Sequence, residues 1–403
     1  MANKKSKNTK NTKAKTAKKT NEQIAVEGAV NAAKKLHKKN PKLLIAIVAI
    51  VVTAAIIVGA LYVVKPEWFR GPMPESGQLV VHYIDVGQGD CIYIAFPDGT
   101  DMLIDCGSEK GRKEYETSAI SDLKELNPDG KIDRVMATHS DTDHISYLDE
   151  VLSEFQVGNV YMPNIRSNNL DKSVKIGGRD VKVGDIDASK LKKFTDKDTI
   201  DTERYTEFFI AALSEPNCNI TLNIGKYEIR GQDYTFTFYC LSQEEWDSRS
   251  LKTKAGRSDA TQINAVSPIG ILEYAGRRLV FTGDSNNSNE KYYCETYPYV
   301  DCDVLKVAHH GSRTSSSEEF LKHVKCEYAV IRSATGTLTV IPNRKRLTAL
   351  KQTAYKKSTA PTSAETSFSR CRTRAKWHFR AKNNAPLDLV AKSENCGYNI
   401  IKV

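Results

Sequence analysis

The sequence contains no CxxC pair among its nine cysteines, and it contains no short tandem repeat. The missing CxxC spacing excludes a zinc ribbon and similar structural zinc modules. An odd number of cysteines also prevents every thiol from pairing within one chain. Cys91 and Cys106 lie in apolar, strand-like runs, so we expect buried thiols there rather than metal ligands.

Acidic residues are scarce at both ends of the chain and in excess between them. The net charge is near +11 for residues 1–42, near −13 for residues 43–331 and near +12 for residues 332–403, so the overall +10 conceals an acidic middle. An acidic body does not attract nucleic acid by bulk charge, and such a partner must be bound by local features. Residues 1–42 are too polar to bury a core, which predicts a disordered basic tail.

One long uncharged run is present, LLIAIVAIVVTAAIIVGALYVV at residues 43–64. At about 1.5 Å per residue it spans roughly 30 Å, the thickness of a bilayer's hydrocarbon core. It is too long for the apolar core of a signal peptide. Because lysines crowd its N-terminal side, we predict a single-pass transmembrane helix at 43–64, a cytoplasmic tail at 1–42, a linker at 65–77 and an outward-facing remainder.

From residue 78 the apolar pattern shortens to strand length. Runs at 79–86, 91–96 and 100–105 are separated by turn sequences, and a later hairpin is expected to turn at Ala275-Gly276. Strand–loop–helix units follow each group of hairpins, with a helix expected from about His144. Residues 165–220 are polar and are expected to form loops with one short helix. This order predicts an α/β fold, an αββα sandwich over residues 78–331.

The stretch THSDTDHIS, residues 138–146, places four potential metal ligands between a predicted strand and a predicted helix. Helix capping explains one aspartate but not two histidines and two aspartates. His139 and Asp141 can bind one metal ion, and Asp143 and His144 an adjacent one.

Two further strand ends carry residues of the same kind. Asp284 follows the apolar run LVFTG, and His309 and His310 follow LKVA. Three strand ends that deliver ligands to one edge predict a pair of divalent ions about 3.5–4 Å apart, which needs a bridging carboxylate.

Five motifs together resemble the metallo-β-lactamase fold, in the branch found as the hydrolase domain of ComEC-type competence proteins. They are HxDxDH at 139–144, DVGQGD at 85–90, LIDCG at 103–107, FTGD at 281–284 and HHGS at 309–312, and the resemblance covers roughly residues 79–331. It implies Zn²⁺ or Mn²⁺ bound by His139, Asp141, Asp143, His144, Asp284 and one of His309 and His310. It also implies that Asp105 is a buried structural carboxylate that orients the ligand loop.

The resemblance further implies catalytic roles for Asp143, His309 and His310, and substrate contacts for Gln88, Asn264 and Ser267. We therefore predict a membrane-anchored, outward-facing dinuclear hydrolase of phosphodiesters, either DNA or a phosphorylated surface polymer, with a separate DNA-uptake channel as a partner. Two alternatives stay open: a hydrolase of carboxylic esters, lactones or β-lactams, and a non-catalytic surface binding module with a damaged site. The oligomeric state is left open.

The basic segment 332–403 does not continue the resemblance. The family continues with a segment like YGHP and ends near YRTDECGN, and neither is present. Codons that encode LTVIP at 338–342 can be read one base earlier as YGHP. In the same frame, codons for residues 356–366 can be read as KVYRTDECGN. We hypothesise a frameshift near residues 331–333, in the gene or in its sequencing.

Overall fold

The computed structural model describes residues 78–332 apart from gaps at 110–112, 170, 177–178, 196, 198 and 253–258. It also describes residues 34, 40–43, 45–50 and 52–53, and four later strands at 338–342, 373–380, 388–393 and 396–401. The chain divides into two compact units, Met1–Phe69 and Arg70–Val403.

Within the described part of the first unit, no helix is both long enough and apolar enough to cross a membrane. Most of the predicted transmembrane span at 43–64, and nearly all of the predicted tail at 1–42, lie outside the described residues. The linker at 65–77 lies outside them as well.

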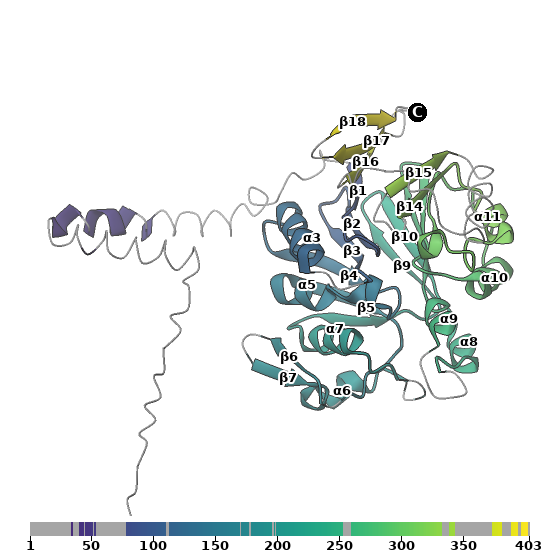
Figure 1. The fold of residues 1–403 in the computed structure, drawn as a ribbon, viewed down its shortest axis with the longest axis horizontal. Coiled ribbons are helices and arrows are strands. Elements are labelled where there is room, and N and C mark those ends of the chain that lie inside the picture. The colour runs from purple at the N-terminus through teal and green to yellow at the C-terminus, as the bar shows by residue number, and fades with distance from the viewer. Residues whose placement is uncertain are drawn as a thin grey trace, which may run out of the picture. The chain divides into compact units, whose positions relative to one another are not determined.

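Two large sheets form the centre of the second unit (Figure 1). The nine-stranded sheet has the strand order β18 (Cys396–Ile401), β17 (Asp388–Ser393), β16 (Thr373–Arg380), β1 (Gln78–Tyr83), β2 (Cys91–Ala95), β3 (Asp101–Cys106), β4 (Lys131–Met136), β5 (Gln156–Met162) and β8 (Asn219–Leu222). The seven-stranded sheet has the order β15 (Leu338–Pro342), β14 (Tyr328–Arg332), β13 (Val304–Lys306), β12 (Arg277–Phe281), β11 (Ile269–Tyr274), β10 (Tyr234–Tyr239) and β9 (Lys226–Gly231).

Helices cover the outer face of each sheet (Figure 1). Between β3 and β8 of the nine-stranded sheet, the chain forms α3 (Lys113–Leu126), α4 (Thr142–Ile145), α5 (Leu148–Glu154), α6 (Ala188–Leu191) and α7 (Glu203–Ser214). The later helices are α8 (Gln243–Ser248), α9 (Ala260–Asn264), α10 (Asn287–Thr296) and α11 (Glu318–Val324). A small hairpin of β6 (Ser173–Ile176) and β7 (Arg179–Lys182) lies beside α7.

Three apolar cores fill the spaces between these layers. Alternation along the strands separates them: in β2, Ile92 and Ile94 point into the core between the sheets, while Tyr93 points toward α3, α5 and α7. In β12, Leu279 faces the other sheet and Val280 faces α10 and α11. Layers of helix, sheet, sheet and helix therefore confirm the predicted αββα sandwich.

The structure corrects two local predictions. The helix expected from His144 begins at Thr142 and is interrupted after Ile145, giving α4 and α5. Residues 165–220 contain more structure than loops and one short helix. They form β6, β7, α6, α7 and the start of β8, and eight of the twelve residues of α7 are buried in the core. The predicted hairpin at Ala275-Gly276 is confirmed, and both residues have the positive φ that such a turn requires.

Candidate metal centre

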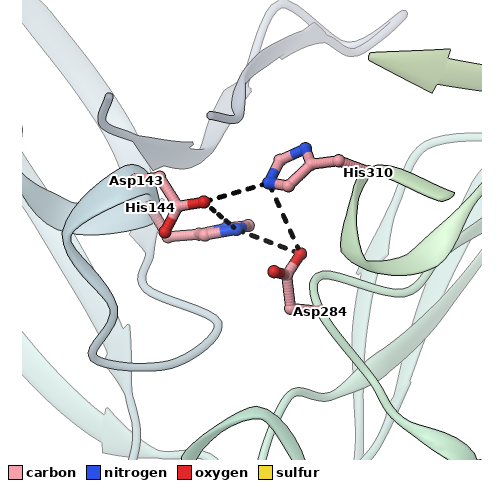
Figure 2. Close-up of side chains that lie close together, drawn as sticks. All are labelled: Asp143, His144, Asp284 and His310. Carbon is pink, nitrogen blue, oxygen red and sulfur yellow. Dashed lines mark hydrogen bonds and ion pairs between the residues drawn. The ribbon is translucent and has the colours of Figure 1, made fainter. Parts of the chain in front are cut away.

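The predicted ligands come from segments that follow three strand ends. β4 leads into α4, β12 into the turn that holds Asp284, and β13 into the 3₁₀ turn η3 (Ala308–Gly311) with its two histidines. β12 and β13 are parallel neighbours, so their carboxyl ends lie at one edge. Figure 2 shows Asp143 and His144 approaching from one sheet, and Asp284 and His310 from the other.

Four of these side chains form a compact group. Asp143, His144, Asp284 and His310 each offer a ligand atom, and these atoms all lie within 4.8 Å of one another. Nε2 of His144 is 3.1 Å from Oδ1 of Asp284, and Nε2 of His310 is 3.1 Å from Oδ2 of Asp143. Two imidazole nitrogens and two carboxylates form a donor set that both Zn²⁺ and Mn²⁺ accept.

The electrostatics of this group fit a bound cation. Nε2 of His144 and Oδ1 of Asp284 are buried and face each other without a hydrogen bond. Burial alone would raise the pKa of Asp284, but the surrounding histidines, His144 first, hold it well below its usual value. Burial would likewise lower the pKa of His144, but Asp284, Asp105 and Asp143 raise it well above its usual value. The buried carboxylates therefore favour a positive charge at this place, which a divalent cation would supply.

The other predicted ligands lie beside this group, and one of them is close to the other oxygen of Asp284. Nε2 of His309 is 3.6 Å from Oδ2 of Asp284, and Nε2 of His139 is 3.7 Å from Oδ2 of Asp141. Asn264 lies between Asp141 and His309. With its amide oriented to satisfy both ends, Asn264 donates to Oδ2 of Asp141 at 2.9 Å, and its oxygen faces Nδ1 of His309 at 3.3 Å.

Asp105 connects the ligand loop to the end of β3. Its Oδ1 accepts from the backbone N–H of Thr138 at 2.7 Å, and its Oδ2 accepts from the Thr138 hydroxyl at 2.8 Å. The same Oδ2 lies 2.7 Å from Nδ1 of His144, while the Thr138 hydroxyl lies 3.0 Å from Nδ1 of His139. One buried carboxylate thus fixes the orientation of two ligand histidines, directly and through Thr138.

A buried ion pair beneath the site was not singled out from the sequence. Lys306, from β13, pairs with Asp90, which precedes β2, and both side chains are almost fully buried. Oδ1 of Asp90 lies 3.9 Å from Nδ1 of His310. Burial would raise the pKa of Asp90, but the ammonium of Lys306 and the nearby histidines lower it. The sequence feature that could have indicated this ion pair is a lysine, Lys306, inside the apolar run VLKVA.

The backbone at the site is held in unusual conformations. His309 and His310 have φ values of 50° and 49°, and Asp105 has a φ of 56°. Such values cost energy in residues with a side chain, and they cluster at functional sites. Gly89 has a φ of 147°, and a Cβ there would lie 2.2 Å from the carbonyl oxygen of Gly107. Glycine at position 89 therefore allows the DVGQGD loop to approach the end of β3.

The three predicted substrate contacts differ in their surroundings. Asn264 is buried against the ligands described above. Ser267 is also buried, and its hydroxyl accepts from the backbone N–H of Asp284 at 3.3 Å. Gln88 is half-buried, and its carbonyl accepts from the N–H of Glu109 at 2.9 Å. The structure brings Asn264 and Ser267 to the ligands, and a contact of any of the three with substrate stays a prediction.

Comparison with known sequences agrees with this geometry. Residues 84–212 match the family described as the metallo-beta-lactamase superfamily. The chain is 25% identical over 290 residues to ComE operon protein 3 of Bacillus subtilis, covering 69% of this chain and 31% of that protein. It is 36% identical over 102 residues to Recombination protein 2 of Haemophilus influenzae, covering 24% of this chain and 12% of that protein. The chain therefore spans less than a third of each relative.

Solved structures with a related arrangement include the metallo-beta-lactamase fold protein YhfI from Bacillus subtilis, at 15% identity and a TM-score of 0.31 over 57% of this chain and 70% of that one. The Rm3 metallo-beta-lactamase matches at 13% identity and a TM-score of 0.35, over 72% of this chain and 94% of that one.

Proposed function

Since the chain has the metallo-β-lactamase fold, whose members are typically metal-dependent hydrolases, we propose that it is a hydrolase with two divalent metal ions, acting on phosphodiesters. The observation that carries the proposal is the compact group of Asp143, His144, Asp284 and His310, because it is complete as a ligand set. Beside this group, Nε2 of His139 lies 3.7 Å from Oδ2 of Asp141, and the ring of His139 lies against that of His144.

The ligand residues divide naturally between two ions. Asp143, His144 and His310 would hold one ion, His139 and Asp141 would hold the other, and Asp284 would help to hold both. Bound Zn²⁺ or Mn²⁺ supplies Lewis acidity toward a phosphoryl oxygen and toward the attacking water. The chain's own contribution is to fix the ligands before binding, through Asp105, and to keep bulk water out of a buried site.

Exposure distinguishes the two histidines of the HHGS motif. The side chain of His310 is 8% exposed and that of His309 is 33% exposed. We therefore assign His310 as a ligand and His309 as the residue that meets the substrate. Burial is the main cause that lowers the pKa of His309, which favours its neutral imidazole, and this half-buried ring can hydrogen-bond a substrate oxygen.

The relatives favour a DNA-related substrate. One is named as a ComE operon protein and the other as a recombination protein. The acidic body of this chain requires local contacts for a polyanion, and a phosphorylated surface polymer fits the same chemistry. We further propose membrane anchoring through residues 43–64, an outward-facing domain, and a separate DNA-uptake channel as partner.

The test is an assay of the purified full chain, loaded with Mn²⁺ or Zn²⁺, on three substrates: bis(p-nitrophenyl) phosphate, single-stranded DNA and nitrocefin. Hydrolysis of the phosphodiester or of DNA, lost in Asp284→Ala, is the expected result. Cleavage of nitrocefin alone would instead favour the ester, lactone or β-lactam alternative. Metal binding without any hydrolysis, under conditions where the chain is folded, would favour a binding module.

A further inference from the structure

Two buried thiols face each other across adjacent strands beside the metal centre. Cys91 begins β2 and Cys106 ends β3, and the two residues are directly paired in the antiparallel ladder. Their sulfur atoms are 3.1 Å apart, and both side chains are at most 1% exposed. Neither thiol belongs to a group of residues that could hold a metal ion within the described part of the chain.

This placement meets the geometric conditions for a covalent bond between the sulfurs. Directly opposed residues of an antiparallel pair have Cβ atoms about 4.5–5.5 Å apart, close to the roughly 3.5–4.5 Å that a disulfide needs. The ladder shifts register between Cys91 and Ile92, so the backbone at the pair is already irregular and can absorb a small adjustment. Burial raises the pKa of Cys91, so its thiol is a poor nucleophile while the pair stays packed in the core.

We propose that Cys91 and Cys106 form a disulfide that fastens β2 to β3. The bond forms by exchange with a disulfide oxidant, such as glutathione disulfide or a disulfide oxidoreductase. One cysteine attacks an oxidant sulfur and releases one thiol, and the other then attacks the mixed disulfide and releases the second. The two cysteines lose two electrons and two protons, and the oxidant's S–S bond is reduced to two thiols. Because the pair is buried, exchange takes place while the β2–β3 hairpin is open.

The bond would act on the metal centre through its immediate neighbours in sequence. Asp90 precedes Cys91 and Asp105 precedes Cys106, and the carboxylates of both aspartates lie within 4.8 Å of a His144 ring nitrogen as one group. The N–H of Gly107 also donates to the carbonyl of Asp90 at 3.1 Å, which links the same two segments. A disulfide here therefore holds in place the two carboxylates that orient the ligand histidines.

To test this, the full chain is refolded in glutathione buffers of increasing oxidised fraction, and exchange is stopped with acid. Free thiols are then alkylated, and the peptides are mapped by mass spectrometry. We expect the peptides with Cys91 and Cys106 to become joined, along a two-electron titration curve, while Cys240 stays alkylated. Cys240, which directly follows β10, is the matched control, because it is also a buried thiol whose pKa is raised by burial. Alkylated Cys91 and Cys106 in the most oxidising buffer would overturn the proposal.

A second measurement connects the bond to the fold. The oxidised chain is expected to unfold at a higher temperature than the chain reduced with a phosphine. The difference should vanish in the Cys91→Ala/Cys106→Ala double variant and persist in Cys240→Ala. An equal difference in all three chains would contradict the proposal. Peptide mapping uses neither metal nor substrate, so failure of the hydrolase assay would leave this result unaffected.

Discussion

At the scale of single residues, the metal centre depends on carboxylates that are buried and yet charged. Asp284 shows this most clearly, since it is 2% exposed and lies near three histidines. The HxDxDH, FTGD and HHGS motifs contain the four side chains that the structure brings together, and their role as ligands stays a prediction. The choice between His309 and His310 was not predictable, because the two are adjacent and differ only in how the strained η3 turn exposes them.

Asp284→Asn should remove metal from the chain while leaving its shape nearly unchanged. The substitution deletes the charge that both ligand sets share, so metal affinity should fall by more than the roughly 10–100-fold typical for loss of an outer-shell partner. The measurement is metal content after dialysis, together with calorimetric titration of Mn²⁺ or Zn²⁺. Asp301→Asn, at an exposed carboxylate, is the control. An unchanged metal content would contradict the assignment of Asp284.

Asp101, at the other end of β3 from Asp105, should make stability depend on pH. Burial is the main cause that raises its pKa from 3.8 to about 7, although it accepts from the N–H of Asp133 and from the Tyr93 hydroxyl. The folded state then binds a proton that the unfolded state has released, so stability is highest at low pH within this window and falls as pH rises from about 4 to about 7.

Asp101→Asn should flatten that dependence, since an amide does not titrate. Urea unfolding at several pH values between 4 and 8 measures the free energy of unfolding. Between these limits its decrease should be smaller in the variant by on the order of a few kcal/mol. Asp171→Asn, at an exposed position, should keep the slope of the unmodified chain. A slope that Asp101→Asn does not change would show that other groups carry the dependence.

At the scale of elements, the sequence predicted hairpins better than long-range pairs. Turn residues such as Ala275-Gly276 act locally, and both hairpins formed where expected. Only one short helix was expected in residues 165–220, and the length and burial of α7 were not predicted, although eight of its twelve residues are buried. The pair Asp90–Lys306 was missed because its members come from different sheets and meet only in the folded chain.

A double-mutant cycle on Asp90 and Lys306 should separate stability from metal binding. Asp90→Asn alone leaves a buried ammonium unpaired, which costs roughly 3–5 kcal/mol. Adding Lys306→Met removes that charge and should restore most of the loss in urea unfolding. Metal affinity should nevertheless stay about 10–100-fold lower in the double variant, because His310 has lost the carboxylate near its Nδ1.

The control for this cycle is the exposed pair Lys322–Glu318, substituted in the same way. Its single substitutions should change stability by no more than about 1 kcal/mol. If the Asp90→Asn/Lys306→Met variant bound metal as tightly as the unmodified chain, Asp90 would have no part in orienting His310.

At the scale of the whole molecule, net charge divides the chain into a basic N-terminal segment, an acidic middle and a basic C-terminal segment. The boundaries of the sheets do not follow this division, because β15–β18 of the basic C-terminal segment also pair into them. The acidic stretch contains the sandwich's central strands and every predicted ligand, whereas the basic ends flank it.

Deletion of residues 43–64 should move the chain from the membrane fraction to the soluble fraction of the cells that express it, because no other run of this length lacks charge. Unchanged fractionation would contradict the predicted anchor.

The basic segment 332–403 leads to a prediction that nucleotide sequencing decides. Arg332, the last residue of β14, lies within the region of the proposed frameshift and forms an ion pair with Asp85, so β14 packs as a core element as far as this region. Read one base earlier, the actual codons for residues 338–342 should give YGHP, and those for residues 356–366 should give KVYRTDECGN. Different codons at either segment would end the hypothesis.

If the codons agree, a restored-frame chain should bind metal more tightly than the present chain under the same dialysis. The reason is that the YGHP segment contains a histidine, whereas the present chain has none at residues 338–342. Replacing only that histidine by alanine in the restored chain should reverse the gain. A gain that survives this replacement would instead come from better closure of the sheets, and the histidine would have no role at the metal centre.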